Sequence, residues 1–249
     1  MFARVTFNQA IIEAVLLGGS AVAAHLALEL REPSLASAIA ILVAFFLPPI
    51  WGALRLGPHD EGDPAQRVLR TATFGLQLGL FVAGLGAAEK LAALALAGKS
   101  LPVPLSVWLA VAIFFAVCSA IAYALIVLGV RTIMAVHRDP QVVADYIFPS
   151  RQGSLDTATA LAYSLVPGLG HYYLGRPQRG AGFMLVTVEL ALAALCAIIA
   201  GLILVWEARA RFDPFFDLAV IILLSPLVLV LASIVDVLAL RPRSSDAPR

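Results

Sequence analysis

The sequence predicts an all-α protein: a polytopic bundle of six full membrane-spanning helices plus one re-entrant or short seventh segment. Composition indicates this class first, because 61% of the 249 residues are hydrophobic and only 13% are charged, a balance too apolar for a soluble globular domain. Span length indicates it second, because the apolar residues come in runs of about 20 or more, which is what a helix needs to cross a bilayer core of about 30 Å.

An acidic residue stands directly before a proline at four places in the chain, and these pairs predict most of the helix boundaries. The pairs are Glu32-Pro33, Asp63-Pro64, Asp139-Pro140 and Asp213-Pro214. A carboxylate suits a helix start because it caps the free amides, and proline is tolerated at the first helical position. The full spans are expected at residues 8–28, 36–54, 71–97, 106–135, 183–206 and 216–240.

The first four spans form a front region, residues 1–138. Glu13 interrupts the apolar part of the first segment, which favours a retained span over a cleaved signal peptide. In the second span, Pro48 and Pro49 predict a kinked last turn. Trp51 follows them and is typical of the aromatic belt at the membrane surface.

A small-residue face is expected on the third span. Gly75 and Gly79 lie four residues apart in the sequence GLQLG, a spacing that lets a second helix approach closely. Gln77 between them could form a hydrogen bond across the helices for a modest gain in stability. We therefore expect this span to pack closely against a neighbour.

Residues 139–156 form a linker between the front and back regions. The first part of this linker predicts a short amphipathic helix on the membrane surface, and its apolar face consists of Val142, Val143, Tyr146 and Ile147. The back region covers residues 157–240. The polar residues 241–249 form a tail whose composition predicts disorder.

The back region contains one stretch, residues 164–180, that does not have the composition of a membrane helix. It reads SLVPGLGHYYLGRPQRG. Pro167, Gly168 and Gly170 break a helix, and a membrane tolerates such a break only where protein or water satisfies the freed backbone groups. The stretch therefore predicts a helical segment that is interrupted at residues 167–170.

Charge placement predicts that residues 157–175 enter the membrane without crossing it, because Lys and Arg concentrate in cytoplasmic loops. With both termini cytoplasmic and the segment re-entrant, twelve of the 17 Lys and Arg residues face the cytoplasm. A crossing segment would leave only nine of the 17 there. Under this topology Tyr172 and Tyr173 lie at headgroup depth, while Arg176 and Arg179 face the cytoplasm and lipid phosphates.

The run PGLGHYYLGRPQRG resembles the signature of the two-transmembrane-helix domain and related small bacterial membrane domains. That signature is roughly Pro-Gly-x-Gly, a polar residue, an aromatic pair, Gly, and a basic run leading to the next helix. The matching residues are Pro167, Gly168, Gly170, His171, Tyr173, Gly175, Arg176, Arg179 and Gly180. The resemblance covers about residues 155–240 and implies a membrane fold without an established chemistry.

The front region is similar to a bacterial family of uncharacterised four-helix membrane proteins that are distantly related to the Tic channel subunit of chloroplast import. The similar pieces are AHL (24–26), FLPPIWGALR (46–55), RTATFGLQLGLF (70–81) and VRTIMAVHRDPQVVADYIFPSR (130–151). This resemblance implies a four-helix membrane fold and likewise no chemistry.

Ionisable side chains inside membrane spans are costly, so each one is a candidate functional residue. Glu89 and Lys90 lie near the expected outer end of the third span, where an adjacent pair can extend its charges to the membrane surface. Asp236 is interpreted as a helix-end carboxylate paired with the nearby Arg241.

The candidate polar or lipid-contact residues are Glu13, His171, Tyr173, Arg176, Arg179 and Glu189. Glu189 lies about 15 Å along the helix from Arg179. It could pair with His171 or Arg179 if the re-entrant segment folds back beside the fifth span. A buried structural hydrogen bond is one account of Glu13 and Glu189, and a proton or ion path is the other.

Metal sites, cofactors and catalysis are not expected. Cys118 and Cys196 fall inside spans as free thiols without metal-ligand spacing, and His25 in the first span is not interpreted as a ligand. The motifs H-E-x-x-H, G-x-S-x-G and G-x-x-x-x-G-K-[ST] do not occur in the sequence. A formal charge of +1 gives no indication of nucleic-acid binding.

The leading hypothesis is a non-enzymatic protein of the bacterial inner membrane that scaffolds or assists the assembly of a membrane-protein partner or of a homo-oligomer. The short loops favour contacts through helices and lipid. The alternative is a small transporter or channel-like protein with a polar path at Glu13, Glu189 and the broken segment 167–170. A third hypothesis is lipid-headgroup binding by Arg176 and Arg179.

Overall fold

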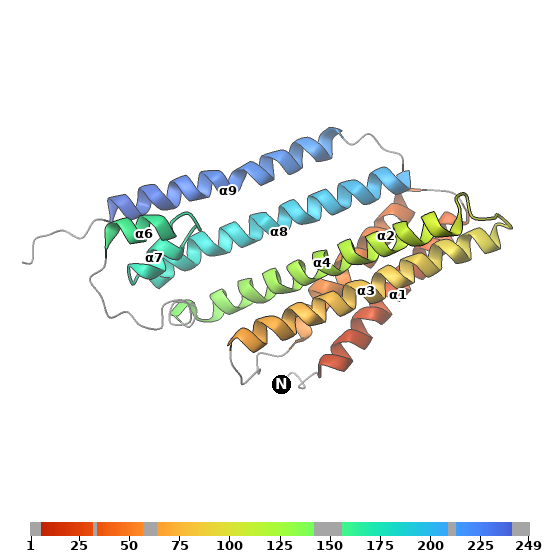
Figure 1. Cartoon of the computed structure of the whole chain (residues 1–249), viewed down its shortest axis with the longest axis horizontal. Helices are drawn as coiled ribbons and strands as arrows, with labels where there is room; N and C mark the ends of the chain where they lie inside the picture. Colours follow the sequence, from red (N-terminus) through yellow and green to blue (C-terminus); the bar gives the residue numbers. More distant parts are fainter. Residues whose placement is uncertain (1–5, 32–33, 57–63, 142–155, 209–212, 241–249) are drawn as a thin grey trace, which may run out of the picture. The chain divides into compact units, whose positions relative to one another are not determined.

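The computed structural model describes residues 6–31, 34–56, 64–141, 156–208 and 213–240, and every regular element in that part of the chain is a helix (Figure 1). The helices are α1 (Phe7–Glu29), α2 (Leu35–Arg55), α3 (Pro64–Leu96), α4 (Leu105–Arg138), α6 (Thr157–Tyr163), α7 (Leu169–Tyr173), α8 (Pro177–Ala208) and α9 (Asp213–Ala239). The predicted all-α class is confirmed for the described residues.

Five of the helices are long and apolar enough to cross a membrane. The stretches that qualify are Phe7–Glu29, Ala36–Arg55, Ala65–Leu96, Leu105–Arg138 and Pro177–Leu202. In α9, which is 27 residues long, the apolar stretch found among the described residues is the shorter Leu227–Ala239. By length and composition the chain is a helical membrane protein.

Some predicted features lie outside the described residues. Most of the predicted amphipathic helix and linker falls within residues 142–155, and the predicted polar tail is residues 241–249. Arg241, the predicted partner of Asp236, belongs to that tail.

The described chain divides into two compact units. One unit contains residues 1–131 and 195–216, and the other contains residues 132–194 and 217–249. The division passes through α4, α8 and α9, so each of these helices contributes residues to both units.

In the first unit, α1 packs against α2 and α3, and α2 packs against α3. Small residues permit this packing: a Cβ atom added at Gly18 would lie 3.2 Å from Cγ of Pro48, and one added at Gly52 would lie 2.6 Å from the ring of Phe74. Helix α2 continues through Pro48 and Pro49, and both prolines are fully buried. The buried core of this unit consists of Ala10, Ala14, Ala53, Leu56, Phe74, Leu78, Val82, Tyr123 and Val127.

The predicted small-residue face of α3 packs directly on the backbone of α4. A Cβ atom added at Gly75 would lie 2.5 Å from Cα of Ala124, and one added at Gly79 would lie 2.6 Å from Cα of Ala120. Only glycine allows the two backbones to come this close, so the predicted close approach is confirmed.

The side chain that forms a hydrogen bond between α3 and α4 at this contact belongs to α4. Ser119 donates its hydroxyl to the carbonyl oxygen of Gly79 at 3.2 Å. The predicted donor, Gln77, is exposed and makes no such bond within the described residues. It projects from α3 on the side away from Gly75 and Gly79, because a residue two positions along a helix is rotated by about 200°.

In the second unit, the predicted break divides the segment into two short helices. Helix α6 has 7 residues and α7 has 5, and each is far shorter than the roughly 20 residues needed to cross a bilayer. Asp156 caps α6 by accepting hydrogen bonds from the hydroxyl and amide of Thr159 and the amide of Ala158. These bonds hold the pKa of the Asp156 carboxyl below its usual range, so the cap is charged at neutral pH.

The turn between α6 and α7 requires glycine. Gly168 adopts a φ of 95°, a left-handed conformation that L side chains rarely adopt. A Cβ atom added at Gly168 would also meet the carbonyl oxygen of Gly180 in the first turn of α8. On the other side, a Cβ atom added at Gly170 would lie 2.5 Å from the carbonyl oxygen of Ala160 in α6. The broken segment is therefore packed backbone to backbone against α6 and α8.

Tyr172 forms the core of the second unit. Its side chain is fully buried and clusters with Val136 of α4 and Ala181 of α8. The ring occupies the space that a side chain at Gly180 would fill, since a Cβ atom there would lie 2.7 Å from Cδ2 of Tyr172. The glycine-lined turn directs this ring into the protein, and the expected depth of Tyr172 in the membrane stays a prediction.

Candidate functional site

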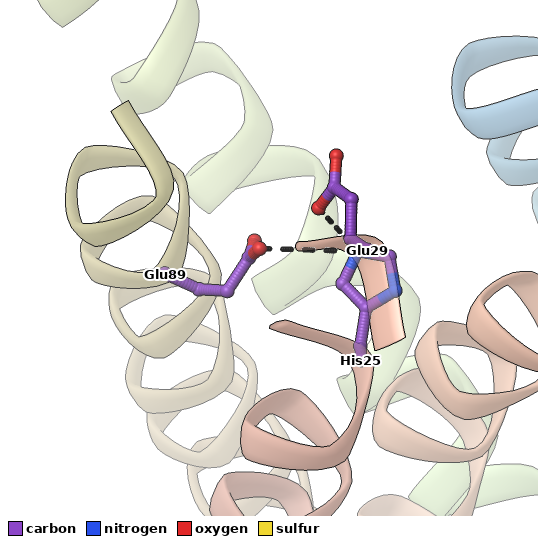
Figure 2. Close-up of side chains that lie close together, drawn as sticks. All are labelled: His25, Glu29 and Glu89. Atoms are coloured by element: carbon purple, nitrogen blue, oxygen red, sulfur yellow. Dashed lines mark ion pairs between the residues drawn. The ribbon is translucent and has the colours of Figure 1, made fainter. Parts of the chain in front are cut away.

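A buried histidine and two glutamates meet near the C-terminal end of α1. His25 and Glu29 lie one turn apart on the same face of α1, because residues i and i+4 are neighbours on a helix surface. Glu89 reaches toward them from α3, as Figure 2 shows. We call these three residues the His25 cluster.

The donor atoms of the His25 cluster are close together. Nε2 of His25 lies 3.2 Å from Oε2 of Glu29 and 3.9 Å from Oε1 of Glu89. One donor atom from each residue can be chosen so that all three lie within 4.8 Å of one another. The side chain of His25 is completely buried, that of Glu89 is 1% exposed and that of Glu29 is 31% exposed. Two of the three side chains are therefore buried, and the third, that of Glu29, is partly exposed.

The backbone of α2 orients the histidine ring. Nδ1 of His25 lies 2.9 Å from the carbonyl oxygen of Ser37, and a carbonyl oxygen only accepts hydrogen bonds. Nδ1 therefore carries the hydrogen and donates a hydrogen bond to the carbonyl oxygen of Ser37. As a result, Nε2 is the nitrogen that faces the two carboxylates.

Lys90 borders the cluster on its open side. Its Nζ lies 3.4 Å from each carboxylate oxygen of Glu29 and 4.0 Å from Oε2 of Glu89. The expectation that Glu89 and Lys90 both extend to the membrane surface is wrong for Glu89, which is buried. Adjacent residues are rotated by about 100° around a helix, so one member of the pair faces the bundle while the other faces outward.

A second buried histidine joins three elements of the second unit. Nε2 of His171 in α7 lies 2.8 Å from Oδ2 of Asp236 in α9. Arg179 in the first turns of α8 donates from Nη1 to both oxygens of Asp236, at 3.2 and 3.3 Å. Asp236 therefore connects the broken segment to the start of α8 and the end of α9.

His171 is enclosed by the protein on every side. Its side chain is fully buried, and its ring stacks on that of Phe183 with centroids 4.9 Å apart. Nδ1 has no hydrogen-bond partner among the described residues. Close by, the amide of Gly168 lies 3.4 Å from Oγ of Ser233, which adds a further bond between the turn and α9.

The predicted partners of His171 and Arg179 are therefore revised, whereas the predicted pairing of Asp236 with Arg241 stays a prediction. The sequence suggested Glu189 for His171 and Arg179, but the structure gives both of them Asp236. Glu189 is exposed and makes no hydrogen bond or ion pair with the described residues. It lies ten residues beyond Arg179, close to three helical turns, so its position along α8 separates it from Asp236.

Glu13 has its own partners in the first unit. Arg55 donates from Nε and Nη2 to the two carboxylate oxygens, at 2.9 and 3.0 Å. Trp51 donates its indole N–H to the same carboxylate at 3.2 Å, and Arg55 also lies over the Trp51 ring. The carboxylate thereby joins α1 to the last turn of α2.

The other candidate residues lie at the surface of the broken segment. Tyr173 is half-buried and packs against the ring of Tyr163, with centroids 5.4 Å apart. Arg176 is exposed, and Arg179 is half-exposed despite its bond to Asp236. Residues 175–179 line an open hollow at the surface.

The sequence reasoning missed the His25 cluster. Glu29 stands four residues after His25, and that spacing was a signal for a histidine–carboxylate pair on one helical face. The contribution of Glu89 had no local signal, because it arrives from α3 through the packing of α3 on α1.

Comparison with known proteins adds no family assignment. No family model matches the chain, and neither a curated protein nor a solved structure matches it. The two family resemblances therefore stay predictions, and a function has to be proposed from the geometry.

Proposed function

We propose that the protein is a non-enzymatic integral membrane protein of the bacterial inner membrane that serves as a scaffold or assembly partner. It contacts a membrane-protein partner or a second copy of itself through α8. The observation that carries this proposal is the exposed carboxylate of Glu189 within an apolar helix.

The other carboxylates that the structure describes within these helices have basic neighbours. Glu13 pairs with Arg55, Glu29 with Lys90, and Asp236 with Arg179. Glu189 differs because its side chain is exposed. It lies about 18 Å along the axis of α8 from the first residue of that helix, which places it within the length of helix that would span the membrane. An ionised carboxylate at mid-membrane costs about 3 kcal/mol, so a donor or cation from a neighbouring polypeptide would stabilise it.

Photo-crosslinking beside Glu189 tests the proposal. We expect a photoreactive phenylalanine analogue at Val186, which is exposed about one turn before Glu189, to form adducts containing a second polypeptide in intact cells while Glu189 keeps its carboxylate. Ala191 is the matched control, because it is also exposed but lies about 160° away from Glu189 around the helix, where no adduct is expected. With the analogue at Val186, the additional substitution Glu189→Gln is expected to lower the yield of adducts.

Crosslinks from position 186 that stay within a single chain would contradict the proposal. They would mean that another part of the same polypeptide covers the face of α8 that carries Glu189. Equal yields from positions 186 and 191 would also contradict it, because a specific contact involves one face of α8.

Transport is the second candidate function. The buried ionisable groups of the His25 cluster favour it, because such groups mark ion and proton pathways in membrane proteins. The predicted polar path at Glu13 and Glu189 has weaker support, since Glu13 already accepts hydrogen bonds from Arg55 and Trp51. Transport predicts that Glu189→Gln abolishes flux in vesicles while leaving expression intact.

The proposed topology has six full spans, both termini in the cytoplasm, and a re-entrant segment formed by α6 and α7. The short lengths of these two helices support it, and so does the placement of twelve of the 17 Lys and Arg residues on the cytoplasmic side. Under this topology Arg176 and Arg179 are positioned to contact lipid phosphates.

A further inference from the structure

We propose that His25, Glu29 and Glu89 form a binding site for one divalent transition-metal ion, with Zn²⁺ as the best match. The proposal is independent of the scaffold function, because it rests on residues of α1 and α3 that the partner contact does not involve.

The donor set has the chemistry of a transition-metal site. One imidazole nitrogen and two carboxylate oxygens are ligands that Zn²⁺ binds at about 2.0–2.2 Å. A nitrogen donor disfavours Mg²⁺ and Ca²⁺, which take oxygen ligands almost entirely. Three protein ligands leave a fourth tetrahedral position for water, and Glu29, at 31% exposure, opens the cluster toward that side.

The spacing of the donor atoms is close to that of a tetrahedral site. Ligand atoms around a tetrahedral Zn²⁺ lie roughly 3.3 Å apart, as its bond lengths require. Nε2 of His25 lies 3.2 Å from Oε2 of Glu29 and 3.9 Å from Oε1 of Glu89.

The histidine is oriented as a metal ligand. Metal-bound histidines usually donate their other ring N–H to a carbonyl or carboxylate, which fixes the ring and its tautomer. The Nδ1 hydrogen bond to the carbonyl oxygen of Ser37 has this geometry, at 2.9 Å. It leaves Nε2 directed at Glu29 and Glu89.

Glu89 supplies an independent observation that points to a ligand. Its side chain is 99% buried, and its Oε1 has no hydrogen-bond partner among the described residues although it points at His25. Nζ of Lys90 lies 4.0 Å from the other oxygen, Oε2. A cation bound at Oε1 would satisfy this buried carboxylate oxygen.

Metal titration of the full chain tests the site. The tag-free protein would be reconstituted in nanodiscs, stripped with a chelator and titrated with Zn²⁺ by calorimetry, with Mg²⁺ as the comparison ion. We expect one Zn²⁺ per chain and no Mg²⁺ binding at the same concentrations. Loss of a second-shell partner typically weakens metal binding ten- to a hundredfold, so Glu89→Gln should weaken it by at least about that factor.

Two further variants make the result interpretable. Glu29→Gln alters the most exposed ligand and should also weaken Zn²⁺ binding while the protein still folds, even if Glu89→Gln does not fold. Asp156→Asn makes the same carboxylate-to-amide change at the cap of α6, where asparagine also caps a helix. This control should bind Zn²⁺ with unchanged affinity.

Co²⁺ substitution gives a second readout of the ligands. The wild-type protein should show the intense visible absorption of four-coordinate Co²⁺, and Glu29→Gln and Glu89→Gln should lose it. Absence of stoichiometric Zn²⁺ binding to the wild-type protein would overturn the proposal. Unchanged affinity in both glutamine variants would overturn it as well, since the ion would then be bound elsewhere.

Discussion

His171 and His25 are both fully buried, but their surroundings have different consequences. His171 faces one carboxylate, and Arg179 already neutralises that carboxylate. His25 faces two carboxylates, one of which is almost completely buried. The first arrangement connects three helices, whereas the second brings an imidazole and two carboxylates together, which is the donor set of the proposed metal site.

Removing Asp236 tests the connection around His171. Asp236→Ala leaves a buried imidazole N–H without an acceptor, which costs about 1–3 kcal/mol. We expect a lower thermal midpoint in nanodiscs and faster proteolysis around α6 and α7. Val235→Ala is the control, because Val235 is 64% exposed and a substitution there should change stability by no more than about 0.5 kcal/mol.

An unchanged midpoint for Asp236→Ala would show that the bonds from His171 and Arg179 contribute nothing to stability. The broken segment would then depend on its glycine packing, on the buried ring of Tyr172 and on the bond from Gly168 to Ser233.

At the scale of elements, close helix contacts depend on where glycine replaces a side chain. Gly75 and Gly79 lie against the backbone of α4, whereas nothing lies within 4 Å of a Cβ atom added at Gly84 or Gly86. The same residue type on the same helix therefore has two different roles. The difference follows from the neighbouring helix and is not visible in α3 itself.

A pair of alanine substitutions measures this difference. Gly79→Ala places a methyl group against the α4 backbone and is expected to destabilise the protein by about 1–3 kcal/mol. Gly84→Ala meets open space and is expected to be neutral or stabilising by up to about 1 kcal/mol, because alanine is the better helix former. Thermal unfolding of the two variants in the same lipid gives the comparison, and equal effects would contradict the packing of α3 on α4.

At the scale of the whole molecule, the short lengths of α6 and α7 bear on the membrane topology. Single cysteines at Ser154, Arg176, Ala208 and Ser245 test it after the two native cysteines have been replaced. We expect a membrane-impermeant reagent to label positions 154, 176 and 245 from the cytoplasm and position 208 from outside.

The opposite pattern has a clear meaning. Labelling of 176 and 245 from outside and of 208 from the cytoplasm would show that residues 157–175 cross the membrane. The six-span topology would then be wrong, and Arg176 and Arg179 would not face cytoplasmic lipid phosphates.

The sequence alone determined the features that depend on local chemistry. Hydropathy and run length predicted the helical class and the long apolar helices, because a bilayer core sets the length of any span. Proline and glycine predicted the break at Pro167 and Gly168, because they limit the backbone directly. The glycine spacing in α3 predicted a close contact for the same reason.

Only the tertiary structure decided which side chains meet. Asp236 binds His171 and Arg179, and Glu89 faces His25, although 65 and 64 residues separate the histidines from these partners in the sequence. Many pairings of charged residues are compatible with the same hydropathy pattern. The rotation and packing of neighbouring helices select one of them, because each helix can turn only one face toward its neighbour.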